Sequence, residues 1–215
     1  MLLMETNQES HEIEPIIKTI LLNEFNELGT SLPELAKSSE LSEKEITQIC
    51  KKANSENLIY DEDGNKRLTE KGRKLIRVVL CGGFFDMIHI GHIETLLEAK
   101  NIGDILIVSV ARDQTIVKIR NKPPIHDESQ RVRLVQALEF VDIALLGSEK
   151  NIFETIKRIS PDVIVLGYDQ KHDEKELINE AAKRGINVSV IRLSSNVQQI
   201  KSSDIKSNTG YIWNI

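Results

Sequence analysis

The stretch that most constrains what this chain can fold into is residues 82–92, Gly-Gly-Phe-Phe-Asp-Met-Ile-His-Ile-Gly-His. It follows a short apolar run at residues 77–81, typical of a buried strand, and precedes apolar residues at helical spacing in residues 93–100. Glycines let backbone amides approach a ligand closely, and the first turn of a helix offers unpaired N–H groups and a positive dipole end. The junction therefore predicts an anion site, with phosphate as the usual ligand.

Two histidines in this stretch, His89 and His92, are three positions apart and point to one side if both lie in the first helical turn. An imidazole can donate to a phosphate oxygen, and Gly91 leaves room between the two rings. The alternatives are a core histidine beside a surface histidine, or a metal-binding pair. No third ligand stands at a set spacing, so the glycines and the preceding strand favour phosphate.

The same residues resemble the G-x-F-D-x-x-H-x-G-H signature of the cytidylyltransferase-like nucleotidyltransferases, over about residues 77–208. The resemblance implies a HIGH-type, Rossmann-like α/β fold, and transfer of a nucleotidyl group from an NTP to a phosphate-bearing acceptor with release of pyrophosphate. It also implies that His89 and His92 are catalytic. The nucleotide-binding residues implied by the signature are Gly82, Gly83, Phe84, Phe85, Asp86, His89, Ile90, Gly91 and His92.

Apolar runs and helical patterns alternate through the rest of the chain, which predicts βαβ units. We therefore expect an α/β domain at residues 77–215, with a doubly wound, five-stranded parallel sheet that binds its ligand at the carboxyl ends of the strands. The further strands are expected at residues 105–110, 141–146, 163–166 and 188–191, and the helices at residues 93–101, 113–119, 127–139, 151–159 and 173–184.

Polar or small residues directly after two of these strands are further nucleotide-binding candidates. Asp113 follows the second strand, and Gly167 and Asp169 follow the fourth, which the family fold places beside the first. The alternative for Gly167 and Asp169 is a plain turn with a cap. Their place at the switch point of the sheet favours the binding role.

Other candidates rest on the family resemblance. It implies that Lys122, taken as catalytic, and Arg131, taken as nucleotide-binding, serve the phosphates. It also implies that Ser202 and Ser203 begin a helix that faces the nucleotide. Upstream of these serines the family's Arg-Thr-Glu-Gly is replaced by a longer segment, so the role of Arg192 stays open.

Within the family, four segments look most like the archaeal FAD synthases: residues 110–115, 121–124, 145–148 and 165–170. This resemblance implies transfer of AMP from ATP to FMN by in-line attack, with Mg²⁺ or a similar divalent cation on the triphosphate. We expect no metal ligands from protein side chains. The alternative is a CTP-dependent cytidylyltransferase that acts on glycerol phosphate or a related polar-lipid precursor.

Residues 13–76 show the pattern of a small winged helix-turn-helix domain, after a polar tail at residues 1–12 that we expect to be disordered. Ser31 and Ser42 each stand three residues before a glutamate and predict capping boxes, and Gly64 predicts the turn of a hairpin. The expected elements are helices at residues 14–28, 31–37, 42–54 and 70–76, with hairpin strands at residues 58–60 and 66–68.

Such a domain often binds duplex DNA, and a homodimer on a palindromic site is then expected. A metabolite-sensing transcription regulator is therefore an alternative function from another class. For the domain itself, the alternative to DNA binding is a role only in packing or dimerisation. The candidate DNA-binding residues are Lys44, Gln48, Lys51, Lys52, Lys66 and Arg67.

Charge and cysteine content bear on DNA binding and on the cellular location of the protein. The chain of 215 residues carries a net charge of −5, and residues 1–76, with fifteen acidic and ten basic residues, account for all of it. An acidic N-terminal part argues against strong nucleic-acid binding. The two cysteines, Cys50 and Cys81, form no disulfide framework, and no signal peptide or membrane-spanning run is evident. We expect a cytoplasmic protein with no membrane partner.

Overall fold

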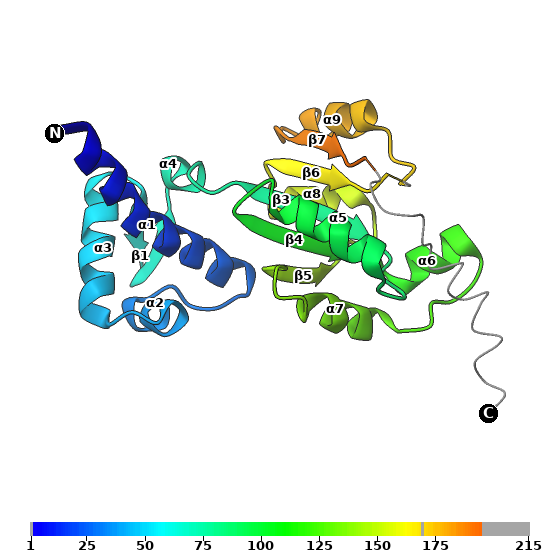
Figure 1. The fold of residues 1–215 in the computed structure, drawn as a ribbon, viewed down its shortest axis with the longest axis horizontal. Helices are drawn as coiled ribbons and strands as arrows, with labels where there is room; N and C mark the ends of the chain where they lie inside the picture. Colours follow the sequence, from blue (N-terminus) through cyan, green and yellow to red (C-terminus); the bar gives the residue numbers. More distant parts are fainter. Residues whose placement is uncertain (1, 169, 195–215) are drawn as a thin grey trace. The chain divides into compact units, whose positions relative to one another are not determined.

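In the computed structural model, residues 2–168 and 170–194 are described. The chain divides into two compact units, Met1–Arg77 and Val78–Ile215 (Figure 1). Among the described residues, no helix combines the length and the apolar character that crossing a bilayer requires.

The first unit has three helices, an antiparallel hairpin and a short fourth helix. Buried aliphatic side chains from all three helices, such as Ile16, Leu35 and Ile46, form its core. The elements are α1 (Leu2–Phe25), α2 (Leu32–Ser39), α3 (Glu43–Ser55), β1 (Ile59–Glu62), β2 (Asn65–Leu68) and α4 (Glu70–Arg73).

The start of this unit differs from the prediction, because the expected disordered tail at residues 1–12 is helical from Leu2 onward. No glycine or proline interrupts residues 2–14, and glutamate and glutamine favour helix. The helix also ends earlier than Leu28. Glu27 adopts a left-handed backbone (φ +56°), and the Leu28 amide donates back to the Asn23 carbonyl at 2.8 Å, a pattern that stops helices.

The two capping boxes and the hairpin turn predicted for this unit are confirmed. The Glu34 carboxylate accepts from the Ser31 amide at 3.0 Å, and that of Glu45 accepts from the Ser42 amide at 2.9 Å, as capping boxes require. Gly64 lies at φ +80° in the turn between β1 and β2. Helix α4 ends at Arg73 rather than at residue 76.

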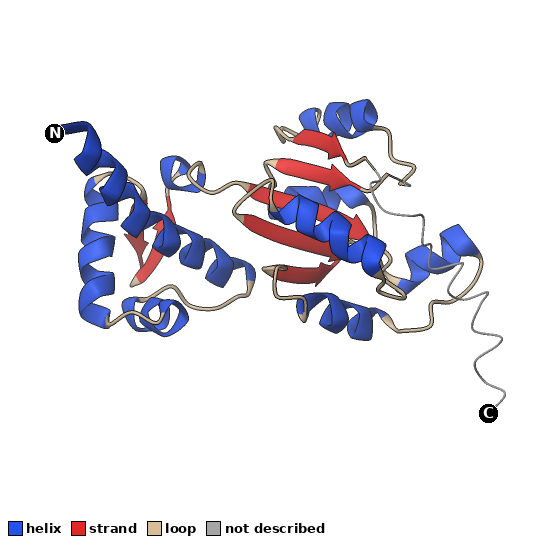
Figure 2. Ribbon diagram, viewed as in Figure 1, coloured by secondary structure: helices blue, strands red, loops and turns tan. Residues whose placement is uncertain are grey.

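The second unit contains the predicted five-stranded parallel sheet, with strand order β5-β4-β3-β6-β7. Figure 2 shows these strands side by side with helices on the two faces of the sheet. The strands are β3 (Val78–Gly83), β4 (Ile105–Val110), β5 (Ile143–Leu146), β6 (Val163–Leu166) and β7 (Ser189–Arg192). The helices are α5 (Ile90–Lys100), α6 (Asp113–Arg120), α7 (Glu128–Gln136), α8 (Ile152–Ile159) and α9 (Glu174–Ala182).

Alternate residues of the central strands face each helical layer. Val79 and Cys81 of β3 pack with Leu96 of α5 and Val135 of α7 in one buried cluster, while α8 covers the opposite face (Figure 1). This is the doubly wound α/β fold that the apolar runs predicted.

Strand β3 lies at the centre of the sheet, with β4 on one side and β6 on the other. The chain reverses its winding direction between β3 and β6, so the sheet's switch point lies at their carboxyl ends. Residues after β3, β4 and β6 therefore meet at one edge, where the candidate site is found.

Candidate active site

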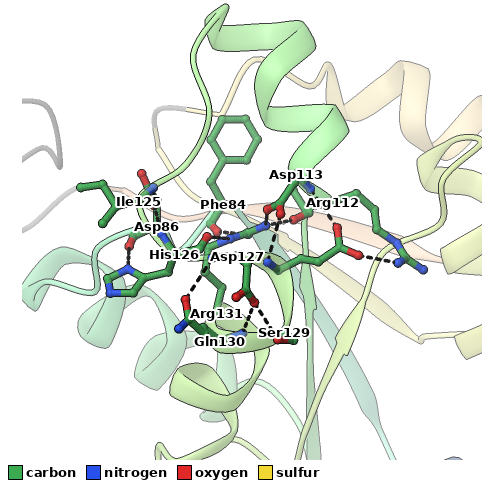
Figure 3. Close-up of polar contacts among 12 residues, drawn as sticks. Phe84, Asp86, Arg112, Asp113, Ile125, His126, Asp127, Ser129, Gln130 and Arg131 are labelled. Carbon is green, nitrogen blue, oxygen red and sulfur yellow. Dashed lines mark hydrogen bonds and ion pairs between the residues drawn. The ribbon is translucent and has the colours of Figure 1, made fainter.

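The signature begins where β3 ends, and its two phenylalanines point in different directions. Phe85 adopts a left-handed backbone (φ +51°), and its side chain is only 3% exposed. A Cβ on Gly83 would lie 2.8 Å from the buried Phe85 ring, so any larger residue there would force the ring to shift. The Phe84 ring instead points toward α6, away from the polar contacts of the site (Figure 3).

The two signature histidines lie at the start of α5, as predicted. His89 is the N-cap residue and its carbonyl accepts from the amide of His92 at 2.9 Å. Their rings stack with centroids 3.9 Å apart and planes inclined by 28°, and the Phe85 ring lies 5.2 Å from that of His92. The pair thus combines two imidazoles with the positive end of a helix, which suits a phosphate group.

Asp86 anchors the loop that carries Lys122. Its side chain is 2% exposed, and one carboxylate oxygen accepts from the amides of Ile125 at 2.6 Å and His126 at 3.3 Å. The ring Nδ1 of His126 lies 2.8 Å from the Asp86 carbonyl oxygen. The sequence predicted nucleotide contacts for Asp86, whereas in the structure the carboxylate holds backbone. Lys122 itself is exposed.

Arg131 joins three segments beneath the site and is fully buried, at 0% exposed. Its guanidinium donates to the carbonyls of Phe84 at 2.6 Å, Ala111 at 2.7 Å and His126 at 3.1 Å. It also donates to the Asp113 carboxylate at 2.7 Å (Figure 3). The sequence predicted phosphate contacts for Arg131, but burial and these four bonds make it a positioning residue. A buried guanidinium is stable only when its donors are paired in this way.

Asp113 and Glu128 cap each other's helices. The Glu128 carboxylate accepts from the Asp113 amide at 3.0 Å, and the Asp113 carboxylate accepts from the Glu128 amide at 3.3 Å. The Asp113 amide, with help from the Arg112 guanidinium at 2.7 Å, keeps the pKa of Glu128 below its usual value. Asp113, a predicted nucleotide ligand, is thus engaged with both Arg131 and α7.

The loop after β6 is held by Arg192, whose role the sequence left open. The Arg192 guanidinium donates to the carbonyls of Gly167 at 3.1 Å and Gln170 at 2.8 Å, and to the Glu174 carboxylate at 2.8 Å. The side-chain amide nitrogen (Nε2) of Gln170 in turn donates to the Gly82 carbonyl at 2.6 Å. The signature and the loop that contains Gly167 are therefore linked directly.

Several residues of this network were not singled out as site residues, namely Glu128, His126 and Gln170. Gln130 stands three positions after Asp127, a capping-box pattern that was available as a signal for the start of α7 beside Glu128. No sequence signal identifies His126 or Gln170, because their partners are backbone atoms distant in the chain. The predicted site residues Asp169, Ser202 and Ser203 lie outside the described residues.

Metal binding by the protein alone finds no support in the part of the chain that the structure describes. Within residues 2–168 and 170–194, no three His, Cys, Asp or Glu side chains gather in a way that holds a metal ion.

Comparison with known proteins agrees with this geometry. The profile of the cytidylyltransferase-like family matches residues 80–208, more than half of the chain. The chain belongs to the cytidylyltransferase-like family, which places it among the nucleotidyltransferases, and the family and the α/β fold predicted for the second unit are confirmed. Residues 1–79 lie outside the match.

Among individual proteins, the chain is similar to archaeal ones. The chain is 52% identical over 122 residues to the FAD synthase of Archaeoglobus profundus, covering 56% of this chain and 76% of that protein. It is 44% identical over 127 residues to the FAD synthase of Thermoplasma acidophilum, covering 59% of this chain and 89% of that protein. A crystal structure described as a lipopolysaccharide core biosynthesis protein from Thermoplasma volcanium superposes with a TM-score of 0.55 at 44% identity, covering 57% of this chain and 99% of that one.

Proposed function

We propose that this protein is an FAD synthase that transfers AMP from ATP to FMN and releases pyrophosphate. The observation that carries the proposal is the similarity to archaeal FAD synthases at 44–52% identity, across the unit that holds the histidine pair. The fold supports it, because the pair lies at the switch point where α/β sheets bind nucleotides.

The chemistry needs no covalent intermediate on the protein. An oxygen of the FMN phosphate attacks the α-phosphorus of ATP in line, a new P–O bond forms, and the bond to the β-phosphate oxygen breaks as pyrophosphate leaves. The FMN phosphate oxygen is already ionised, so no proton has to be removed from the nucleophile. Catalysis then consists of positioning the two phosphates and stabilising charge between them.

Three side chains supply these effects in the proposal. His89 and His92 donate to oxygens of the α-phosphate, at the positive end of α5. Lys122, exposed at the rim, places its cation on the ATP phosphates or the leaving pyrophosphate. Mg²⁺ or a similar divalent ion neutralises the triphosphate when ATP binds.

The decisive experiment measures pyrophosphate release by the purified full-length chain. ATP, CTP, GTP and UTP are each paired with FMN, glycerol 3-phosphate or phosphopantetheine, with and without Mg²⁺, and FAD is identified by chromatography. We expect product with ATP, FMN and Mg²⁺. A CTP-dependent product from glycerol 3-phosphate, with none from FMN, would establish the cytidylyltransferase alternative instead.

Duplex DNA binding by the first unit, and the homodimer expected with it, stay predictions. Of the candidate residues, Lys44, Gln48 and Lys51 are exposed on α3. The wing cations are engaged elsewhere: Lys66 pairs with Asp61, and Arg67 lies 3.2 Å from both Glu24 and Glu62. These ion pairs weaken the case for a regulator relative to the enzyme.

A further inference from the structure

Residues 120–126, here called the arch, are attached at both ends to the signature loop. At one end, the guanidinium carbon of Arg120 lies 4.6 Å from the centroid of the Phe84 ring. At the other, the Ile125 amide donates to the Asp86 carboxylate at 2.6 Å. The two ends of the arch are therefore held by Phe84 and Asp86, which are two positions apart in the signature. Lys122 lies between these two attachments.

The backbone of the arch is restricted by its own sequence. Asn121 has a left-handed backbone (φ +53°), which ends α6. Pro123 and Pro124 fix two further φ angles, and each limits the residue before it. A surface shaped in this way before substrate arrives loses little conformational entropy on binding.

The arch and the last turn of α6 carry unusual apolar exposure. Ile119 is 66% exposed and Ile125 is 60% exposed, more than any other large hydrophobic side chain within residues 12–168 and 170–194. Ile119 directly precedes Arg120, whose guanidinium lies over the Phe84 ring, and the Ile125 amide bonds to Asp86, two positions after Phe84. Phe84 is half-buried and turns its ring toward α6 (Figure 3). Exposed aliphatic groups on a segment held to the signature loop suit a ligand with both an apolar and an anionic part.

We propose that the flavin ring of FMN binds against Phe84, Arg120 and Ile125, with its phosphate directed toward the histidine pair. This inference rests on the proposed FAD synthase function and adds a subsite for the acceptor ring. A guanidinium stacks on planar rings, and a flavin has the flat, apolar area to cover Ile119 and Ile125. Glycerol phosphate has no such ring, so this surface predicts a preference for FMN over that acceptor.

The test compares the double variant Ile119→Ser/Ile125→Ser with the wild type and with Ile178→Ser, an exposed isoleucine on α9 that lies outside the proposed subsite. Loss of aliphatic contact area should raise KM for FMN about tenfold and leave KM for ATP within about twofold. Arg120→Ala should show the same split between the two substrates. Ile178→Ser should behave as the wild type for both.

Riboflavin, which has the ring without the phosphate, serves as a probe that does not depend on turnover. The fluorescence of riboflavin should be quenched when the wild-type protein is added, and FMN should compete with this binding. Riboflavin should bind about tenfold more weakly to the double variant. The subsite would be overturned if the double variant left the KM for FMN unchanged, whether or not its oligomeric state changed. Equal increases in KM for FMN and for ATP would overturn it as well. If the wild type makes no FAD, the proposed function fails; if it makes FAD but the double variant binds riboflavin normally, only the subsite fails.

Discussion

The two units use their basic residues in opposite ways. In the second unit Arg131 is buried, and it joins the segments after β3 and β4 to the start of α7, so one cation organises the site. In the first unit Lys66 and Arg67 of the hairpin are partly exposed and pair with acidic neighbours. A lysine or arginine in a sequence pattern therefore does not say whether its charge is available to a ligand, because neighbouring carboxylates and carbonyls decide that.

The largest effect should come from removing the buried cation. Arg131→Met leaves three carbonyls and the Asp113 carboxylate without their donor, and breaking such a buried network costs about 3–5 kcal/mol. At about 2–4 °C per kcal/mol, Tm should fall by roughly 6–20 °C. Arg133→Met, on the same helix but exposed, is the matched control. Similar Tm values for the two variants would show that Arg131 does not organise the site.

The histidine pair should affect rate rather than stability. His92→Ala removes one donor from the proposed α-phosphate site, and loss of such a donor typically lowers kcat by ~10²–10³. Circular dichroism should show a folded protein, because the backbone amide of His92, which alanine keeps, makes the hydrogen bond to the His89 carbonyl at the start of α5. Turnover close to wild type in a folded His92→Ala protein would contradict a catalytic role for the pair.

Lys122 is the exposed counterpart of Arg131 in the same unit. Lys122→Ala should lower kcat/KM about 10- to 100-fold, since hydrogen bonds to charged groups contribute about 1.5–3 kcal/mol. Its Tm should stay unchanged because the side chain is exposed. Lys157→Ala, an exposed lysine on α8, should leave both quantities as they are, and equal rate losses in the two variants would point to a general charge effect.

The mutual capping of Asp113 and Glu128 should show up in the pH dependence of stability. The pKa of Glu128 is lowered in the folded chain by the Asp113 amide and the Arg112 guanidinium. A lowered pKa stabilises the fold above the unfolded-state value, near pH 4, and this contribution disappears as pH falls through the folded-state pKa. The Tm difference between wild type and Glu128→Gln should therefore shrink from pH 7 to pH 3, and a constant difference would rule out the ionised cap.

The smallest effect is expected in the first unit. If duplex DNA binds, Lys51→Glu should weaken binding, because Lys51 is exposed. The slope of the logarithm of the binding constant against the logarithm of salt concentration should become shallower by about one unit. Lys66→Ala should change binding less, because Lys66 already pairs with Asp61. A selection from random duplexes, with and without FMN, decides whether any sequence is bound. No enrichment would leave the first unit as a packing or dimerisation module.

Local sequence determined most of the fold and the position of the site. The runs before Gly82, at residues 105–110 and at residues 163–166 gave three of the strands because buried parallel strands are continuous apolar segments. The spacing of the two histidines just before a helical pattern predicted their position at a helix start, and this signal also lies within a few neighbouring residues. Tertiary structure alone decided what Asp86, Arg131 and Arg192 do. Their partners are backbone atoms of other loops, and a backbone carbonyl has no sequence identity from which a bond to it can be predicted.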